Sequence, residues 1–130
     1  MTAVLDASAV LTLLYREPGH DTVARSVEGS VISAVNWSEV VQKLAQRGVP
    51  DPAAISSGLL GLGATVVPFL RSDAEAAARL WPAGRANGLS LGDRACLALA
   101  HGLPDGVAVT ADAVWADLDV GVQVLVVGGA

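Results

Sequence analysis

The chain has 130 residues and a formal net charge of −5 at pH 7; 52% of its residues are hydrophobic and 16% are charged. This length predicts one domain spanning 1–130, and the apolar share excludes intrinsic disorder. Apolar runs are far shorter than the ~18 residues that cross a bilayer, no secretory signal pattern opens the chain, and Cys96 is the single cysteine. We therefore expect a soluble, cytoplasmic protein.

The negative net charge argues against a protein that holds nucleic acid mainly by a broad basic surface. It does not exclude a metal-dependent nuclease, because such a centre needs carboxylates and its ions return positive charge. Seven of the eight basic residues are arginine, the better bidentate phosphate ligand, and Lys43 is the only lysine.

The first part of the chain alternates between β-branched and helical patterns. We predict a strand over 2–5, a helix over 7–15, a second helix over 20–27, a strand over 30–35 and a helix over 37–47. Breaks at Glu17-Pro18-Gly19 and at Gly48 separate these segments.

The same alternation continues to the C-terminus. The predicted elements are a helix over 52–62, a strand over 65–69, a helix over 73–80 that Pro82 should end or kink, a helix over 91–101, a strand over 107–110, a short helix over 113–118 and a strand over 123–127. Short apolar strands separated by helices predict an α/β fold of three layers, α/β/α, with a central parallel sheet of four or five strands.

Four acidic residues fall where such a fold places its active crevice, beyond the carboxyl ends of the strands. Asp6 directly follows the first strand, Glu39 lies early in the helix after the second, and Asp112 follows the strand over 107–110 by two residues. Asp93 lies in the first turn of a helix. If these carboxylates meet, they require a cation, and hard oxygen ligands select Mg²⁺ or Mn²⁺.

Helix capping is the alternative explanation for each acid, because the start of a helix favours an anion. Asp6 and Asp112 could be simple N-caps, and three segments resemble capping boxes: 36–39, 72–75 and 90–93. Two carboxylates ~4 Å apart repel by about 4 kcal/mol in a protein-like medium, so four would not gather merely as caps. Sequence alone leaves both explanations open.

Four short motifs, taken in order and spacing over nearly the whole chain, resemble the PIN-domain ribonucleases and, within that family, the VapC-type toxins of bacterial toxin–antitoxin pairs. They are Val4-Leu5-Asp6-Ala7-Ser8-Ala9-Val10, Ile32-Ser33-Ala34-Val35-Asn36-Trp37-Ser38-Glu39-Val40, Leu89-Ser90-Leu91-Gly92-Asp93-Arg94-Ala95 and Val109-Thr110-Ala111-Asp112-Ala113-Val114-Trp115.

The resemblance implies a set of site residues. The acidic quartet would be Asp6, Glu39, Asp93 and Asp112, all catalytic and metal-binding, with Asp6 and Asp93 as the first direct ligands. Ser8, Asn36 and Thr110 would be their polar neighbours. Glu75 falls outside the motifs, and Asp117 comes one helical turn after the fourth acid, where many relatives carry a further acid close behind it.

The resemblance also implies a function. The expected activity is Mg²⁺- or Mn²⁺-dependent endonucleolytic cleavage of RNA by a metal-activated water. The expected partners are an RNA substrate, a small VapB-like antitoxin that masks the site, and a second copy of the chain in a homodimer. No cofactor other than the ion and no membrane contact is expected.

Other functions share an α/β sheet with an acidic crevice. A phospho-acceptor receiver domain needs an acidic pair after the first strand and a late lysine, and a haloacid dehalogenase-type phosphatase needs Asp-x-Asp, whereas this chain has Asp6-Ala7-Ser8. A catalytically silent PIN scaffold that binds RNA or a protein is the stronger alternative.

The chain has three tryptophans, Trp37, Trp81 and Trp115. They could stack bases, but we predict that they are core residues.

Overall fold

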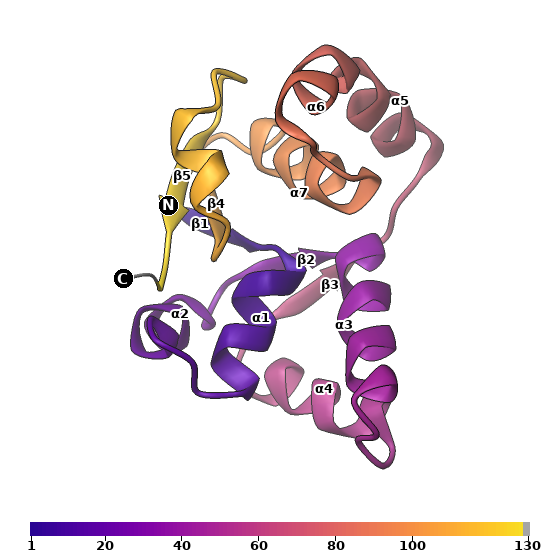
Figure 1. Ribbon diagram of the computed structural model, residues 1–130, viewed down its shortest axis with the longest axis vertical. Coiled ribbons are helices and arrows are strands. Elements are labelled where there is room, and N and C mark those ends of the chain that lie inside the picture. Colours follow the sequence, from indigo (N-terminus) through magenta and orange to yellow (C-terminus); the bar gives the residue numbers. More distant parts are fainter. Residues whose placement is uncertain (129–130) are drawn as a thin grey trace.

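The computed structural model describes residues 1–128 and contains a five-stranded parallel sheet (Figure 1). The strand order is β3-β2-β1-β4-β5, so the first strand lies at the centre. The strands are β1 (Thr2–Leu5), β2 (Val31–Ser33), β3 (Thr65–Val67), β4 (Gly106–Thr110) and β5 (Gln123–Val126). Every pairing is parallel, as short apolar strands separated by helices predict.

Seven α-helices and one 3₁₀ helix connect the strands within the described residues. They are α1 (Ala7–Leu14), α2 (His20–Ser26), α3 (Ala34–Gln46), α4 (Pro52–Gly61), α5 (Arg71–Arg79), α6 (Trp81–Asn87), α7 (Leu91–His101) and the 3₁₀ helix η1 (Ala113–Asp117). The predicted strand over 2–5 and helix over 91–101 are confirmed residue for residue, and most other bounds differ by one or two residues.

Side chains of the central strands alternate between two hydrophobic clusters, one on each face of the sheet. Leu5 of β1 packs in a buried cluster with residues of α1, α2, α3 and α4, whereas the adjacent Val4 packs with α7 and η1 on the other face. Helices therefore cover both faces, which confirms the three-layer α/β/α architecture (Figure 1).

The predicted strand over 30–35 is wrong at its C-terminal end. Helix α3 already begins at Ala34, because the Ser33 hydroxyl accepts a hydrogen bond from the Val35 N–H and acts as the N-cap. The β-branched Val35 favoured a strand in the sequence pattern, but local capping by Ser33 decides the conformation. Asn36 consequently lies in the first turn of the helix, three residues after the N-cap, and Glu39 lies in the second turn.

Helix α6 is an element that the sequence pattern did not predict. Pro82 was expected to end or kink the preceding helix, and it also occupies the first turn of a new one, where its missing N–H costs nothing. Trp81, at the start of α6, is 56% exposed, so the prediction that it is a core residue is wrong, whereas Trp115 is fully buried as predicted.

Among the described residues, no helix combines the length and the apolar character that a membrane-spanning segment needs.

Candidate active site

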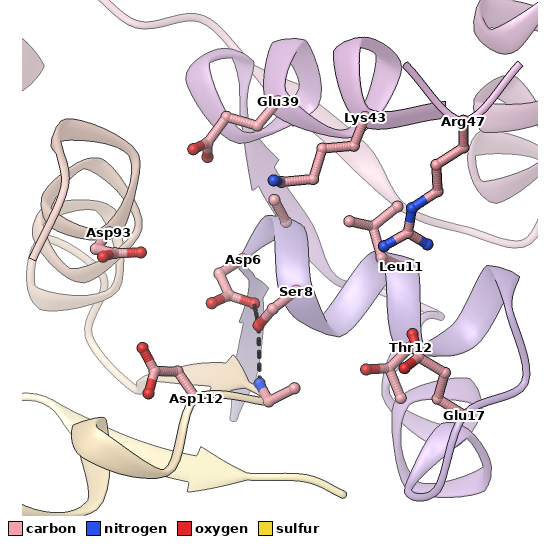
Figure 2. A pocket seen from close by; sticks show the side chains of 12 residues that line it. Asp6, Ser8, Leu11, Thr12, Glu17, Glu39, Lys43, Arg47, Asp93 and Asp112 are labelled. Atoms are coloured by element: carbon pink, nitrogen blue, oxygen red, sulfur yellow. Dashed lines mark hydrogen bonds between the residues drawn. The ribbon is translucent and has the colours of Figure 1, made fainter. Parts of the chain in front are cut away.

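The four predicted acids line one cleft of about 320 Å³. Asp6 follows β1, Asp112 follows β4, Glu39 comes from α3 and Asp93 from the first turn of α7. Figure 2 shows their side chains pointing toward a common space beyond the ends of the strands. The register that pairs Leu5 of β1 with Val109 of β4 brings the first and last acids to the same edge of the sheet.

Asp6 is the most deeply placed of the four and is only 4% exposed. Its Oδ1 accepts hydrogen bonds from the Ala9 N–H at 2.8 Å and the Ser8 hydroxyl at 2.7 Å, so Asp6 caps α1. Its Oδ2 accepts one from the Thr110 hydroxyl at 2.6 Å. A carboxylate oxygen has two acceptor positions, so Oδ2 keeps one for a ligand in the cleft.

Ser8 and Thr110 connect the segments that follow β1 and β4. Besides donating to Asp6, the Ser8 hydroxyl accepts from the Ala111 N–H at 2.9 Å, and the Thr110 hydroxyl accepts from the Asp112 N–H at 3.1 Å. The two hydroxyl oxygens lie 3.2 Å apart. Both residues therefore hold the Asp6 carboxylate and the backbone that carries Asp112 in fixed relative positions.

Asp93 and Asp112 each cap a helix with one oxygen and leave the other unengaged. Asp93 Oδ2 accepts from the Ser90 N–H at 2.9 Å, and the Ser90 hydroxyl accepts from the Asp93 N–H, which confirms the predicted capping box. Asp112 Oδ1 accepts from the Val114 N–H at 3.0 Å. Within residues 1–128 the second oxygen of each receives no hydrogen bond from the protein. Capping and exposure to the cleft are therefore compatible in one side chain.

Glu39 is held by a contact between α3 and α7. The Asn36 side-chain amide donates to Glu39 Oε1 at 2.9 Å and to the Gly92 carbonyl at 3.0 Å. A Cβ at position 92 would collide with the Glu39 carboxylate, so glycine lets the two helices approach at this point. The predicted capping box over 36–39 is wrong, because Asn36 is a buried residue inside α3 whose amide reaches a carbonyl of another helix.

Burial and mutual repulsion raise the pKa of two of the acids. Burial raises the pKa of Asp6 from 3.8 to about 6, although its hydrogen bonds act in the opposite direction, and the charge of Asp93 adds to the rise. Burial also raises the pKa of Glu39, with the hydrogen bond from Asn36 opposing it and Asp93 again adding to it. Asp93 is thus within electrostatic range of both carboxylates, and negative charge accumulates in the cleft.

The donor atoms of the cleft suit a hard divalent cation. They are carboxylate oxygens, and each of the four acids retains at least one acceptor position that the protein does not use. Within the described residues, no group of three or more acidic, histidine or cysteine side chains is close enough to hold an ion as the chain stands. The carboxylates repel one another. A bound divalent cation would offset this repulsion and draw them closer together.

Two other acids that the sequence singled out lie outside the cleft. Glu75 accepts a hydrogen bond from the exposed Arg71 side chain at 3.0 Å, as an i,i+4 ion pair. The capping box predicted over 72–75 is wrong, since α5 begins two residues earlier and Asp73 accepts from the Leu70 N–H. Asp117 ends η1, is exposed and does not line the cleft.

The cleft also contains residues that sequence reasoning did not assign to the site. Lys43 and Arg47 follow Glu39 at four-residue steps along α3, and Thr12 and Glu17 lie opposite them (Figure 2). The i, i+4, i+8 spacing from Glu39 would have placed both cations on the same side of a helix.

The chain belongs to the PIN domain family, which matches residues 3–121. Its fold is shared by Mycobacterium tuberculosis VapC20, a sarcin-ricin loop cleaving toxin, at 17% identity and a TM-score of 0.71 over 93% of this chain and 98% of that one. It is also shared by DNA-bound VapBC from Salmonella typhimurium, at 16% identity and a TM-score of 0.70 over 96% and 97%. PAE2754 from Pyrobaculum aerophilum has 20% identity and a TM-score of 0.61 over 95% and 83%.

None of the curated proteins compared with the chain matches it significantly. The predicted membership of the PIN family is confirmed, and so is the likeness in fold to VapC toxins.

Proposed function

We propose that the chain is a single nuclease domain that acts as a Mg²⁺- or Mn²⁺-dependent endoribonuclease, the toxin of a type II toxin–antitoxin pair. The observation that carries the proposal is the convergence of four carboxylates, from four separate segments, on one cleft at the ends of the strands. Each keeps an acceptor position for a ligand although hydrogen bonds from the protein hold it in place.

The roles we assign follow from these contacts. Asp6 and Asp93 would bind an ion directly, and Glu39 and Asp112 would complete its surroundings directly or through water. A divalent ion held there lowers the pKa of a bound water and offsets negative charge on the phosphate. Ser8 is a positioning residue, since its hydroxyl donates to Asp6 and accepts from the Ala111 N–H.

Thr110 and Asn36 are positioning residues as well. Thr110 holds Asp6 Oδ2, and Asn36 fixes Glu39 relative to the first turn of α7. Because these contacts exist before any ligand binds, the reorganisation required at the site is reduced to the final approach of the carboxylates.

The neighbours in fold support the choice of substrate and partner. VapC20 is a toxin that cleaves the sarcin-ricin loop, and the neighbour from Salmonella typhimurium is a DNA-bound VapBC. We infer by analogy that this chain cleaves RNA in the cytoplasm, is masked by a VapB-like antitoxin and forms a homodimer. A monomer at micromolar concentration by light scattering would contradict the homodimer.

Incubation of the purified protein with labelled RNA, in Mn²⁺ and in EDTA, tests the activity. We expect internal cleavage in Mn²⁺ and none in EDTA. The alternative is a catalytically silent PIN scaffold that binds RNA or a protein. Intact RNA in both conditions would support the scaffold and overturn the nuclease.

Gly92→Ala should weaken ion binding without unfolding the protein. The added methyl group meets the Glu39 carboxylate, so this side chain must move away from its place beside Asp93. We expect a smaller rise in melting temperature on addition of Mn²⁺ than in the wild type. Differential scanning fluorimetry with an Mn²⁺ titration measures it.

Gly58→Ala is the matched control for this substitution. Gly58 also lies in a helix, but a Cβ there would meet nothing within 4 Å, so the variant should gain about 0.5–1 kcal/mol of stability and keep the full response to Mn²⁺. Equal responses in the two variants would contradict the role given to the contact between Gly92 and Glu39.

Expression of the wild-type chain without an antitoxin should arrest growth of a bacterial host, whereas expression of Asp6→Ala should not. The reason is that the variant loses a charged oxygen ligand that the proposed reaction needs. Growth curves after induction, with immunoblots to match protein levels, provide the measurement. Glu75→Ala should remain toxic, because it removes only an exposed i,i+4 ion pair worth about 0.3–0.5 kcal/mol. Growth arrest by Asp6→Ala at the same protein level would argue against a nuclease toxin.

A further inference from the structure

The cleft has an acidic end and a second end, here called the cationic end, which holds Lys43, Arg47 and one acid, Glu17. Lys43 and Arg47 extend from α3 on the side away from Asp93 and Asp112 (Figure 2). Of the basic residues in the part of the chain that the structure describes, only these two line the cleft. Four residues of helix correspond to a rise of about 6 Å, so the two charges lie one turn apart in a row that begins at Glu39.

Neither cation is neutralised within the protein. Among residues 1–128, no carboxylate lies within salt-bridge distance of Lys43 or Arg47. Lys43 is still close enough to Glu39 for its charge to lower the pKa of that carboxyl. Arg94 contrasts with them, although it adjoins Asp93 in sequence, because its guanidinium donates to the Ala77 carbonyl at 3.1 Å. The two positive charges of the cleft therefore come from α3 and its C-cap: Lys43 lies between Glu39 and Arg47, and Arg47 lies at the end where Glu17 is opposite it (Figure 2).

Arg47 has a support that limits its movement. Its guanidinium carbon lies 4.4 Å from the centre of the Tyr15 ring, and Tyr15 is the C-cap residue of α1. Stacking on an aromatic face holds a guanidinium in one orientation and leaves its N–H donors free. An arginine held in this way loses less side-chain entropy when it binds a phosphate.

We propose that Lys43 and Arg47 bind phosphates of the RNA strand on one side of the cleaved bond, and that Tyr15 positions Arg47 for this contact. The inference rests on the proposed ribonuclease function and adds the direction in which the RNA strand lies in the cleft. Carboxylates repel phosphates and the two cations attract them, so a single strand would enter with one arm along α3 and its scissile phosphate over Asp6 and Asp93.

The salt dependence of RNA binding tests the phosphate contacts. A fluorescent single-stranded RNA is titrated with protein in EDTA between about 50 and 200 mM salt, and anisotropy reports the binding constant. Each phosphate contact on a single strand contributes about 0.7 to the slope of log K against log salt. We expect Lys43→Ala and Arg47→Ala each to reduce the slope by about 0.7, and the double variant to reduce it by about 1.4.

Arg85→Ala is the matched control. Arg85 is also exposed and also lies over an aromatic ring, with its guanidinium 5.6 Å from the centre of the Trp81 ring, but it does not line the cleft. Like Arg47→Ala, the variant removes one positive charge from the protein, but it should leave the slope of log K against log salt unchanged. A slope that falls equally in Arg85→Ala and Arg47→Ala, or wild-type binding no stronger than that of the double variant, overturns the proposal.

Cleavage kinetics in Mn²⁺ separate binding from chemistry. Arg47→Ala should raise KM by roughly 10-fold, as expected when a charge-assisted hydrogen bond is lost, and change kcat little, because the residue lies away from the carboxylates. Tyr15→Ala should raise KM in the same direction, and Tyr15→Phe, which keeps the ring, should restore it. A fall in kcat with unchanged KM in Arg47→Ala overturns the proposal.

The two assays distinguish failure of this inference from failure of the proposed function. If the wild type cleaves RNA and the Lys43 and Arg47 variants match Arg85→Ala in KM and salt slope, the phosphate contacts are wrong and the nuclease stands. If the wild type leaves RNA intact but binding falls in the Lys43 and Arg47 variants alone, the nuclease is wrong and the cationic end remains an RNA-binding surface.

Discussion

Asp93→Asn is expected to lower the rate of Mn²⁺-dependent RNA cleavage by at least about 100-fold while the protein remains folded. Loss of a partner outside the ligand shell of a metal typically costs 10–100-fold, so loss of a charged ligand should cost at least as much. Asparagine keeps an oxygen that can accept from the Ser90 N–H, the bond that Asp93 accepts at 2.9 Å. The substitution therefore removes charge and preserves the helix cap.

The same reasoning applies to the other three acids. Asp6→Asn, Glu39→Gln and Asp112→Asn should each reduce cleavage, with the largest loss at Asp6 because it is the most buried of the four. Initial rates on a labelled RNA, with circular dichroism to verify folding, provide the measurement.

Asp73→Asn is the control that isolates chemistry from capping. Asp73 accepts from the Leu70 N–H at 2.8 Å, as Asp93 accepts from the Ser90 N–H, but it does not line the cleft. Its substitution should leave cleavage intact. If Asp73→Asn and Asp93→Asn reduce cleavage equally, Asp93 acts through the stability of its helix and is not a ligand.

Asp6→Asn should stabilise the metal-free protein near neutral pH. The pKa of Asp6 is raised from 3.8 to about 6 in the folded state, so folding favours the protonated acid. Protonated Asp6 contributes fully to the free energy of unfolding below pH 3.8. This contribution is lost as the pH rises through the window between 3.8 and about 6. A shift of about two units corresponds to roughly 3 kcal/mol at most, or a rise in melting temperature of about 10 °C in the variant.

The hydrogen bonds around position 6 allow this substitution. An asparagine oxygen can accept from the Ala9 N–H and the Ser8 hydroxyl, and its NH₂ can donate to the Thr110 oxygen. The Thr110 hydroxyl then turns toward the Ser8 oxygen 3.2 Å away. No buried polar group loses its partner, so the gain from removing a buried charge is not offset by a new unsatisfied group.

Urea unfolding in EDTA at a series of pH values measures the effect. The variant should match the wild type near pH 4 and exceed it near pH 7, and Mn²⁺ should stabilise the wild type more than the variant. Asp117→Asn, an exposed acid outside the cleft, should follow the wild-type curve. A wild-type stability that stays constant between pH 4 and 6, or rises there, would contradict the state assigned to Asp6.

The sequence predicted the features of the site that depend on chain order and local pattern. Asp6 and Asp112 follow strands that pair in parallel, so the edge they share follows from the alternation of strands and helices. The capping box at Ser90 and Asp93 was also predicted, since its contacts span only three residues. Capping and a role in the cleft, weighed as alternatives from sequence, use different oxygens of the same carboxylate.

The features that sequence reasoning missed depend on packing between distant segments. Asn36 matched a local capping pattern, but its amide reaches the Gly92 carbonyl, 56 residues away. The cationic end was missed for a similar reason. The four-residue spacing of Lys43 and Arg47 is visible in the sequence, but its direction toward the cleft depends on how α3 packs beside α1.

Locating the ion tests the central claim most directly, because the proposed function requires that the four acids share a divalent cation. A crystal grown in Mn²⁺ should show an anomalous difference peak in the cleft, with carboxylate oxygens of Asp6 and Asp93 at about 2.0–2.6 Å from it. A crystal of Asp93→Asn prepared in the same way should lose or weaken the peak. A fully occupied Mn²⁺ site elsewhere, with no peak between Asp6 and Asp93, would contradict the account.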